Sequence, residues 1–498
     1  MNKNYIALSL TTLLSLGVIS TSTFAELKLP SGADRRPNLS LDPFERAREA
    51  MRNLPKAQAE EAPKPVETVA EPERKDAGQN PGTTLGNDII KQAATETTKE
   101  SQTETSFLGE QAAEAFSYEF AITMDAFSLT SGGLQEPEDE NTPLKKTGVI
   151  GIVDFIAEVD TAAAGLWDNG LFFLYTALTF GKGPTVGDLH GISSIDAGGD
   201  TMHIMELWYE HSFPYSRSSA IFGIHDFNGD FYVAEYANLF VNAGFGFGQA
   251  IGDNAGPSNY PNTTLGIRLK SEVTENSYFQ IAMYDGAVGT DDESAEAEFN
   301  KIISVKLDKN EGVFVGAEGG IFKNEPGSTD GYYKLALGLW YLRADQEGFD
   351  TPNNDPEGNP IPVLAGNPRP GTGGAYILGE MSIGEKMGIF FKHGRARSEY
   401  LQHSQFYSAG MNFTGAIPGR DEDVLGIGLV YTANSPEYMA QFEEGALYKA
   451  ETTYEITYTA QITDWLMVQP DFQYVQYPNM DPNIVKASVI GVRAQAVF

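Results

Sequence analysis

Hydrophobic and polar residues alternate with a period of two along most of the chain after residue 105. Between 116 and 124 the even-numbered positions carry Phe, Tyr, Phe, Ile and Met, whereas the odd-numbered positions are mostly small or polar. The stretch from 453 to 462 repeats this pattern. Half-buried strands of a soluble β-sandwich would also alternate. The large number of such segments, each about ten residues long with aromatic residues near the ends, favours a transmembrane β-barrel.

The alternating segments can be counted. We expect strands at 116–129, 148–161, 171–180, 201–213, 219–228, 262–272, 277–286, 312–322, 332–343, 375–383, 387–394, 404–414, 424–433, 451–462, 465–476 and 484–498. These are sixteen strands, an even number that places both ends of the barrel domain on the same side of the membrane. A further apolar stretch at 301–307 would break this parity, so we assign it to a loop. A sixteen-stranded barrel encloses a water-filled lumen.

The connections between these strands fall into two classes. Some are short turns, such as 274–277 and 384–386, and others are long and polar, at 229–261, 287–311 and 344–374. Short periplasmic turns and long external loops are typical of barrels in the bacterial outer membrane. The chain ends with alternating apolar residues up to Phe498. We expect the outer-membrane assembly machinery to recognise this last strand.

The region before the barrel has a different composition. Residues 1–25 have a short basic start, an apolar run and a small-residue cleavage site, as in a secretory signal peptide. Residues 26–105 contain one aromatic residue and many Pro, Glu, Ala and Thr, so we expect a mostly disordered periplasmic extension. Within it, Asp42 and Glu45 form a capping box that predicts a short helix near 42–55. We assign 106–498 to the barrel.

Composition and charge exclude several functions. The formal charge of −34 argues against a nucleic-acid partner, because such a chain cannot neutralise phosphates. Cysteine is absent, and no Gly-rich phosphate loop ends in Gly-Lys-Ser/Thr. The six histidines show neither HExxH spacing nor a Gly-x-Ser-x-Gly partner motif. We therefore expect neither an enzyme nor a bound cofactor or metal.

Several short motifs together resemble the carbohydrate-selective porin (OprB-like) family. They follow one another in the family's order from about residue 110 to the C-terminus: WDNGLFFLY at 167–175, ELWYE at 206–210, TLGIRL at 264–269, MYDG at 283–286, PGRDEDVLG at 418–426 and WLMVQPDFQY at 465–474. No single motif is diagnostic. The resemblance implies a sixteen-stranded outer-membrane channel for the passive uptake of small sugars. It does not cover the N-terminal extension.

The residues that face the lumen follow from strand parity once the more apolar face is assigned to lipid. The inward residues that we expect to contact substrate are Glu206, Trp208, Glu210, Arg268, Lys270, Glu318, Lys392, Glu455, Gln473 and Arg493. Carboxylate, amide and guanidinium groups on opposing walls can bind sugar hydroxyls. Trp208 can equally pack beneath an infolded loop. We expect Arg268 to pair with Glu206, Glu210 or Glu318.

The loop at 229–261 is rich in Gly and in aromatic residues, among them six that suggest infolding: Phe231, Tyr232, Tyr236, Phe240, Phe245 and Phe247. Together they carry more apolar surface than a solvated external loop usually exposes. We expect it to fold inward and narrow the pore. The pattern leaves other questions open. The acidic excess also suits a general or cation-preferring porin, and the extension can tether the barrel to a periplasmic partner. The acidic run at 291–298 is better interpreted as a solvated surface segment, with divalent-cation bridging to lipopolysaccharide as the alternative. Porins of this size are often homo-oligomers, but parity does not identify an interface.

Overall fold

The computed structural model describes residues 115–136, 144–286, 312–346, 369–398, 401–443 and 445–498. The signal peptide, the extension with its expected helix at 42–55, the stretch at 301–307 and the acidic run at 291–298 lie outside these ranges. Within them, no helix is long and apolar enough to cross a membrane.

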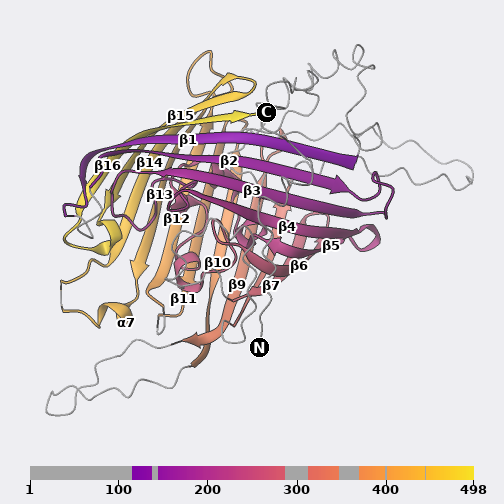
Figure 1. Ribbon diagram of the computed structural model, residues 1–498, viewed down its shortest axis with the longest axis horizontal. Helices are drawn as coiled ribbons and strands as arrows, with labels where there is room; N and C mark the ends of the chain where they lie inside the picture. Colours follow the sequence, from indigo (N-terminus) through magenta and orange to yellow (C-terminus); the bar gives the residue numbers. More distant parts are fainter. Residues whose placement is uncertain (1–114, 137–143, 287–311, 347–368, 399–400, 444) are drawn as a thin grey trace, which may run out of the picture.

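Sixteen antiparallel strands form one closed barrel in which each strand pairs with its neighbours in sequence, and the first pairs with the last (Figure 1). The strands are β1 (Phe116–Gly133), β2 (Thr147–Asp160), β3 (Gly170–Lys182), β4 (Thr201–Phe213), β5 (Ser218–His225), β6 (Thr264–Thr274), β7 (Ser277–Asp285), β8 (Val313–Lys323), β9 (Tyr333–Gln346), β10 (Arg369–Ile383), β11 (Met387–Ala396), β12 (His403–Thr414), β13 (Val424–Asn434), β14 (Ala450–Thr463), β15 (Leu466–Gln476) and β16 (Val485–Val497). The expected fold class is confirmed.

The strand count fixes the arrangement of the connections. Because the number is even, β1 begins and β16 ends at the same end of the barrel, which also carries the short turns. We call this the turn end and the opposite one the loop end. The turn between β6 and β7 is among the shortest, whereas β5 and β6 are joined by a long connection at the loop end. The largest boundary error concerns β10, which begins at Arg369 rather than at 375.

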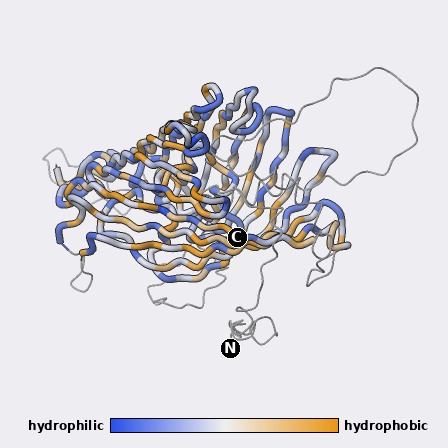
Figure 2. The backbone as a smooth tube through the Cα atoms, turned by 90° about the horizontal axis from the view of Figure 1, so that it is seen from above, coloured by the Kyte–Doolittle hydropathy of each residue, from blue (hydrophilic) through white to orange (hydrophobic). Residues whose placement is uncertain are grey.

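The two faces of the sheet differ in polarity, as the period of two requires. In β9, Leu337 is 58% exposed on the outside, whereas Trp340 is 3% exposed on the inside. Figure 2 shows hydrophobic and hydrophilic residues alternating along the strands. The outer side chains form an apolar surface of the kind that contacts lipid.

Short helices occur in the turns and loops. They are η1 (Pro214–Ser216), α5 (Phe227–Asp230), η2 (Glu235–Leu239), η3 (Ala243–Phe245), α6 (Gly252–Ala255), α7 (Pro436–Met439) and η5 (Pro478–Met480). Four of them belong to the connection between β5 and β6. One β-bulge lies nearby, in β4: Glu206 is opposite Tyr175 and Ile204 is opposite Thr176, so Met205 is the extra residue.

Candidate permeation site

The connection between β5 and β6, residues 226–263, folds into the barrel, and we call it the long inner loop. It begins at Asp226, whose Oδ1 accepts hydrogen bonds from the backbone N–H of Asn228 (2.6 Å) and Gly229 (3.2 Å) and so caps α5. All six aromatic residues that suggested infolding are buried. The expected inward fold of this loop is confirmed.

Carboxylates on the barrel wall hold the backbone of the long inner loop. An irregular segment inside a barrel has backbone N–H groups with no strand partner, and each one needs an acceptor. Three glutamates from three strands supply them. The bonds run from Tyr232 N to Glu318 (2.9 Å), from Tyr236 N to Glu380 (3.0 Å), and from Val241 N and Asn242 N to Glu455 (2.7 and 2.9 Å).

Wall cations and amides bind the carbonyl oxygens of the same loop. The donors are Gln280 to Asp230 O (2.7 Å), Lys334 to Val233 O (2.9 Å), Asn412 to Tyr236 O (2.9 Å), Gln469 to Leu239 O (2.7 Å) and Lys392 to Phe245 O (3.2 Å). Lys392 also lies 4.4 Å from the ring centre of Tyr232, in a cation–π contact. Much of the polar wall therefore binds the backbone of the long inner loop.

Aromatic packing fills the lumen beside the β8–β12 wall. Phe227 meets Phe314 edge-on with ring centres 5.0 Å apart, and Tyr232 lies 4.3 Å from Tyr376. Gly316 makes room for the Phe227 ring, because a Cβ atom at this position would lie 2.3 Å from it. Packed aromatic side chains therefore occupy this side of the lumen.

A second connection also enters the barrel, and the sequence did not predict it. We call residues 183–200, between β3 and β4, the short inner loop. Glu451 of β14 accepts from the backbone N–H of Leu189 (2.8 Å) and His190 (3.0 Å). Gln473 donates to Ile192 O (2.8 Å). The only sequence feature that could have predicted this inward fold is a set of four apolar residues, at 186, 189, 192 and 195.

A cavity of about 330 Å³ remains between the two inner loops and the wall of β1–β3. The wall contributes Thr123, Ile152, Asp154 and Tyr175. The two inner loops contribute polar side chains to the lining: His190, Ser194, Asp226, Asn228, Asn238, Asn242, Gln249, Asp253, Asn259 and Tyr260. The volume is at the lower end of the range for small-molecule sites.

Two tyrosines fix the shape of this cavity. Tyr175 donates its hydroxyl hydrogen to Asp154 Oδ1 (2.7 Å). Tyr260, from the long inner loop, donates to the carbonyl oxygen of Ile195 in the short inner loop (2.8 Å) and so joins the two loops. The cavity therefore has a defined wall of aromatic faces, carboxylates and amides.

Two loop carboxyl groups have raised pKa values. Burial raises the pKa of Asp188 to about 7; the neighbouring charge of Glu451 raises it further, and His190 opposes the shift. The Asp253 side chain is 45% exposed to the cavity but is enclosed by the barrel. This enclosure disfavours the charged form and raises its pKa to about 6.

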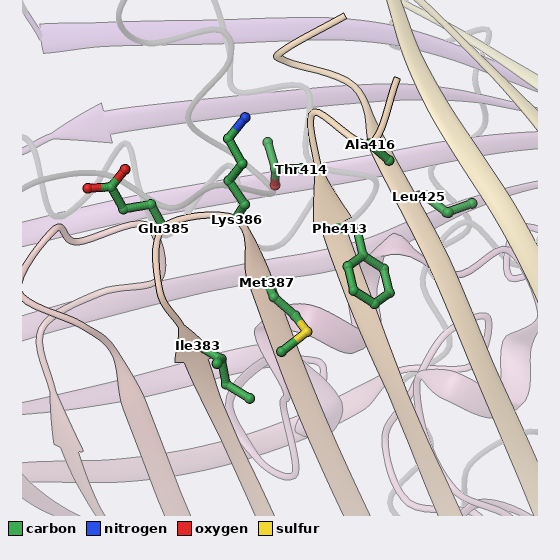
Figure 3. A pocket seen from close by; sticks show the side chains of 8 residues that line it. All are labelled: Ile383, Glu385, Lys386, Met387, Phe413, Thr414, Ala416 and Leu425. Atoms are coloured by element: carbon green, nitrogen blue, oxygen red, sulfur yellow. The ribbon is translucent and has the colours of Figure 1, made fainter. Parts of the chain in front are cut away.

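The outside of the barrel carries a separate hollow of about 760 Å³ at the turn end of β10–β13 (Figure 3). It is lined by Ile383, Met387, Phe413 and Leu425, with Lys386 at its rim. In β10 the even-numbered Leu378 and Glu380 point into the barrel, whereas the odd-numbered Ile383 is 44% exposed on the outer face. The hollow therefore lies on the lipid-facing side of the barrel. It is not part of the lumen.

Comparison with known proteins agrees with this architecture. The model of the family "Carbohydrate-selective porin, OprB family" matches residues 150–498. The chain belongs to the OprB family of carbohydrate-selective porins. It is 21% identical over 346 residues to Porin B of Pseudomonas aeruginosa, covering 63% of this chain and 72% of that protein. It is also similar to the high-pH structure of Pseudomonas putida OprB, with a TM-score of 0.64 and 17% identity over 78% of this chain and 96% of the other.

The lumen residues predicted from strand parity contact loop atoms and one another, which parity alone did not predict. None of the ten expected contact residues lines the cavity. Arg268 donates to Glu210 (3.1 Å), one of its three expected partners, and to Asp230 of the long inner loop (3.0 Å), which was not expected. Glu318 instead holds the loop, and no ion pair joins Arg268 to Glu206 within the described residues.

The remaining expected residues have equally specific partners. Trp208 stacks on Phe173 with ring centres 4.5 Å apart and donates to Glu206 (2.6 Å). It belongs to a buried apolar cluster that also contains Val186 and Ile192 of the short inner loop and Val241 of the long inner loop. Lys270 lies 5.7 Å from the ring centre of Tyr278. Arg493 binds Asp125 of β1. Gln473 also accepts a hydrogen bond from Asn242 of the long inner loop (2.9 Å).

Proposed function

We propose that small sugars cross the outer membrane through this porin by passing the cavity between the inner loops and the β1–β3 wall. The observation that carries the proposal is the cavity itself: a polar space of about 330 Å³ inside a barrel whose opposite side is filled by packed aromatic rings. The path is therefore off-centre. Of the wall residues expected from parity, those that act through the inner loops that they hold are Arg268, Glu318, Lys392, Glu455, Gln473 and Arg493.

The chemistry of the lining suits a sugar. Amide side chains such as Asn228 and Asn238 can both donate to and accept from hydroxyl groups, which sugars carry on almost every carbon. Tyr260 and Phe247 add aromatic surface against which the apolar face of a pyranose ring can lie. A solute that sheds part of its hydration can therefore regain hydrogen bonds on the way through.

We also propose that the turn end faces the periplasm and that the extension at 26–105 lies there. The asymmetry between short turns and long loops supports this, since outer-membrane barrels keep their long loops outside. Protease added to intact cells should cut within 344–374 and leave the turn at 415–423 intact. Cleavage confined to the turns would reverse the proposed orientation.

Planar-bilayer recordings test the route. Glucose should lower the ion current of the wild-type porin, because the sugar and the ions share the narrow cavity. Asn238→Trp places a large ring in the cavity and should reduce both the current and the glucose effect. Leu337→Trp, on the outer face of β9, is the matched control and should change neither. An unchanged current in Asn238→Trp would contradict the route.

A further inference from the structure

We propose that the cavity discriminates among sugars by charge: it favours amino sugars, whose amine is protonated, and disfavours sugars that carry a carboxylate or phosphate. The inference rests on the proposed function, since it names the class of sugar that the proposed route passes best.

The first observation is the charge of the lining. Asp154, Asp226 and Asp253 contribute carboxylates, and no lysine or arginine is among the residues around this cavity. The one basic side chain there is His190. Its Nδ1 lies 2.8 Å from Thr453 and 3.0 Å from Glu451, and its Nε2 lies 2.9 Å from Thr432, so its ring is held by the wall.

The second observation explains why the nearby wall cations do not offset these carboxylates. Arg493 is engaged in a two-point ion pair with Asp125. Arg268 is held between Asp230 and Glu210. Lys392 donates to loop carbonyl groups under the Tyr232 ring. Each positive group is thus bound by carboxylates or backbone carbonyl groups, and of these three only Arg493, through Ser194, and Lys392, through the carbonyl of Gly246, also touch residues of the cavity lining.

The third observation concerns two residues of the long inner loop that are four positions apart. Gln249 lines the cavity and is 6% exposed, and its Oε1 accepts a hydrogen bond from Thr432 (3.3 Å). Asp253 lines the same cavity with a side chain that is 45% exposed, and its carboxylate lies 3.7 Å from Nε2 of His403. The cavity therefore places an amide side chain, which can bind a hydroxyl group, close to an accessible carboxylate, which can bind an ammonium group.

These features act together on a permeating solute. A narrow space lined by one sign of charge and surrounded by low-dielectric protein concentrates the field of its carboxylates. An ammonium group gains energy as it enters such a space, and a carboxylate or phosphate loses energy. A neutral sugar depends on hydrogen bonds alone and falls between the two.

Uptake into proteoliposomes tests the inference with three probes of nearly equal size: labelled glucose, glucosamine and glucuronate. Salt is equal on both sides and pH is near neutral. We expect glucosamine to enter fastest and glucuronate slowest, with a ratio on the order of tenfold between them. Raising the salt concentration should shrink this ratio, because ions screen the field.

Variants locate the effect in the cavity. Asp253→Asn should reduce the glucosamine-to-glucuronate ratio by roughly threefold. Asp421→Asn, at an 81% exposed side chain in the β12–β13 turn, is the matched control and should behave as wild type. Asn238→Asp adds a carboxylate to the lining and should raise the ratio, so the test does not depend on one variant folding.

The outcomes separate the two proposals. If glucose does not enter, the proposed function fails and the inference fails with it. If glucose enters but glucuronate matches glucosamine, the function stands and the charge discrimination is overturned. A clear ratio that Asp253→Asn and Asn238→Asp both leave unaltered would also overturn it, because the selective field would then come from elsewhere.

Discussion

Arg493 of β16 and Asp125 of β1 lie directly opposite each other in the register that closes the barrel. Their side chains form a two-point ion pair, with Nε–Oδ1 and Nη2–Oδ2 distances of 2.7 Å each. Asp125 also accepts from the Ser193 hydroxyl (2.6 Å), and Arg493 donates to Ser194 (3.1 Å). The closing seam of the barrel is thereby joined to the short inner loop.

Breaking this pair should destabilise the barrel. Asp125→Leu leaves the Arg493 charge buried without its partner, and such losses cost about 3–5 kcal/mol. Urea unfolding in detergent micelles measures the change. The double variant Asp125→Leu/Arg493→Met removes both charges and should recover most of the lost stability. A double variant as unstable as the single one would show that the seam depends on packing and not on the ion pair.

Lys392→Met should loosen the long inner loop. The side chain keeps much of its volume but loses its bond to Phe245 O and its contact with the Tyr232 ring. We expect a larger and noisier single-channel conductance, because the segment of the long inner loop around Phe245 is then held less tightly. Lys386→Met, at a 65% exposed side chain in the β10–β11 turn, is the control. Equal conductance in both variants would contradict the anchoring role.

Arg268→Ala should raise the preference for cations. The substitution removes the positive charge that binds Asp230 and Glu210 at 3.0 and 3.1 Å, so this part of the lumen becomes more negative. Reversal potentials in a salt gradient measure the shift. Ile267→Ala, on the lipid-facing side of the same strand, should leave the potential unchanged. An Arg268→Ala porin with the wild-type potential would show that these charges lie outside the ion path.

Acidification should weaken cation preference. Asp188, with a pKa of about 7, faces Glu451 and His190, and Asp253, with a pKa of about 6, faces His190, Glu451 and His403. Both pKa values are raised, so the negative charges are present at high pH and are lost as pH falls through these values. Reversal potentials should therefore decline mainly between about pH 8 and about pH 5.

Asp188→Asn and Asp253→Asn together should remove most of this pH dependence. They should leave a weaker cation preference that varies little over the same interval. A double variant that keeps the full wild-type pH dependence would assign the titration to other groups in the lumen.

Much of the fold was predictable because membrane barrels impose a simple rule on sequence. Every strand must present apolar residues to lipid, so the period of two marks strands even where β-propensity is weak. The long inner loop was predictable for a related reason: its aromatic residues had no plausible place in an external loop. The bulge at Met205 could not be predicted, because it changes which residues of β4 point inward and nothing in the local sequence marks it.

The candidate site could be predicted only in part. Parity identifies which wall residues point inward, but it carries no information about which loop atoms they meet. Asp230 binds Arg268 only because the long inner loop brings it there, and Glu318 is unavailable because it holds Tyr232 N. The short inner loop has little apolar surface, so its entry was missed, and with it the cavity that both loops define.

The chain has no cysteine, which permits the most direct test of the proposed route. Asn238→Cys places one thiol in the cavity lining, and Lys270→Cys places one on the inward wall outside it. Each variant is treated with a thiol reagent about the size of a monosaccharide, and glucose entry into proteoliposomes is measured before and after. The account predicts that modification at 238 strongly slows glucose entry and that modification at 270 does so far less. Slower entry after modification at 270, with no change at 238, would contradict it.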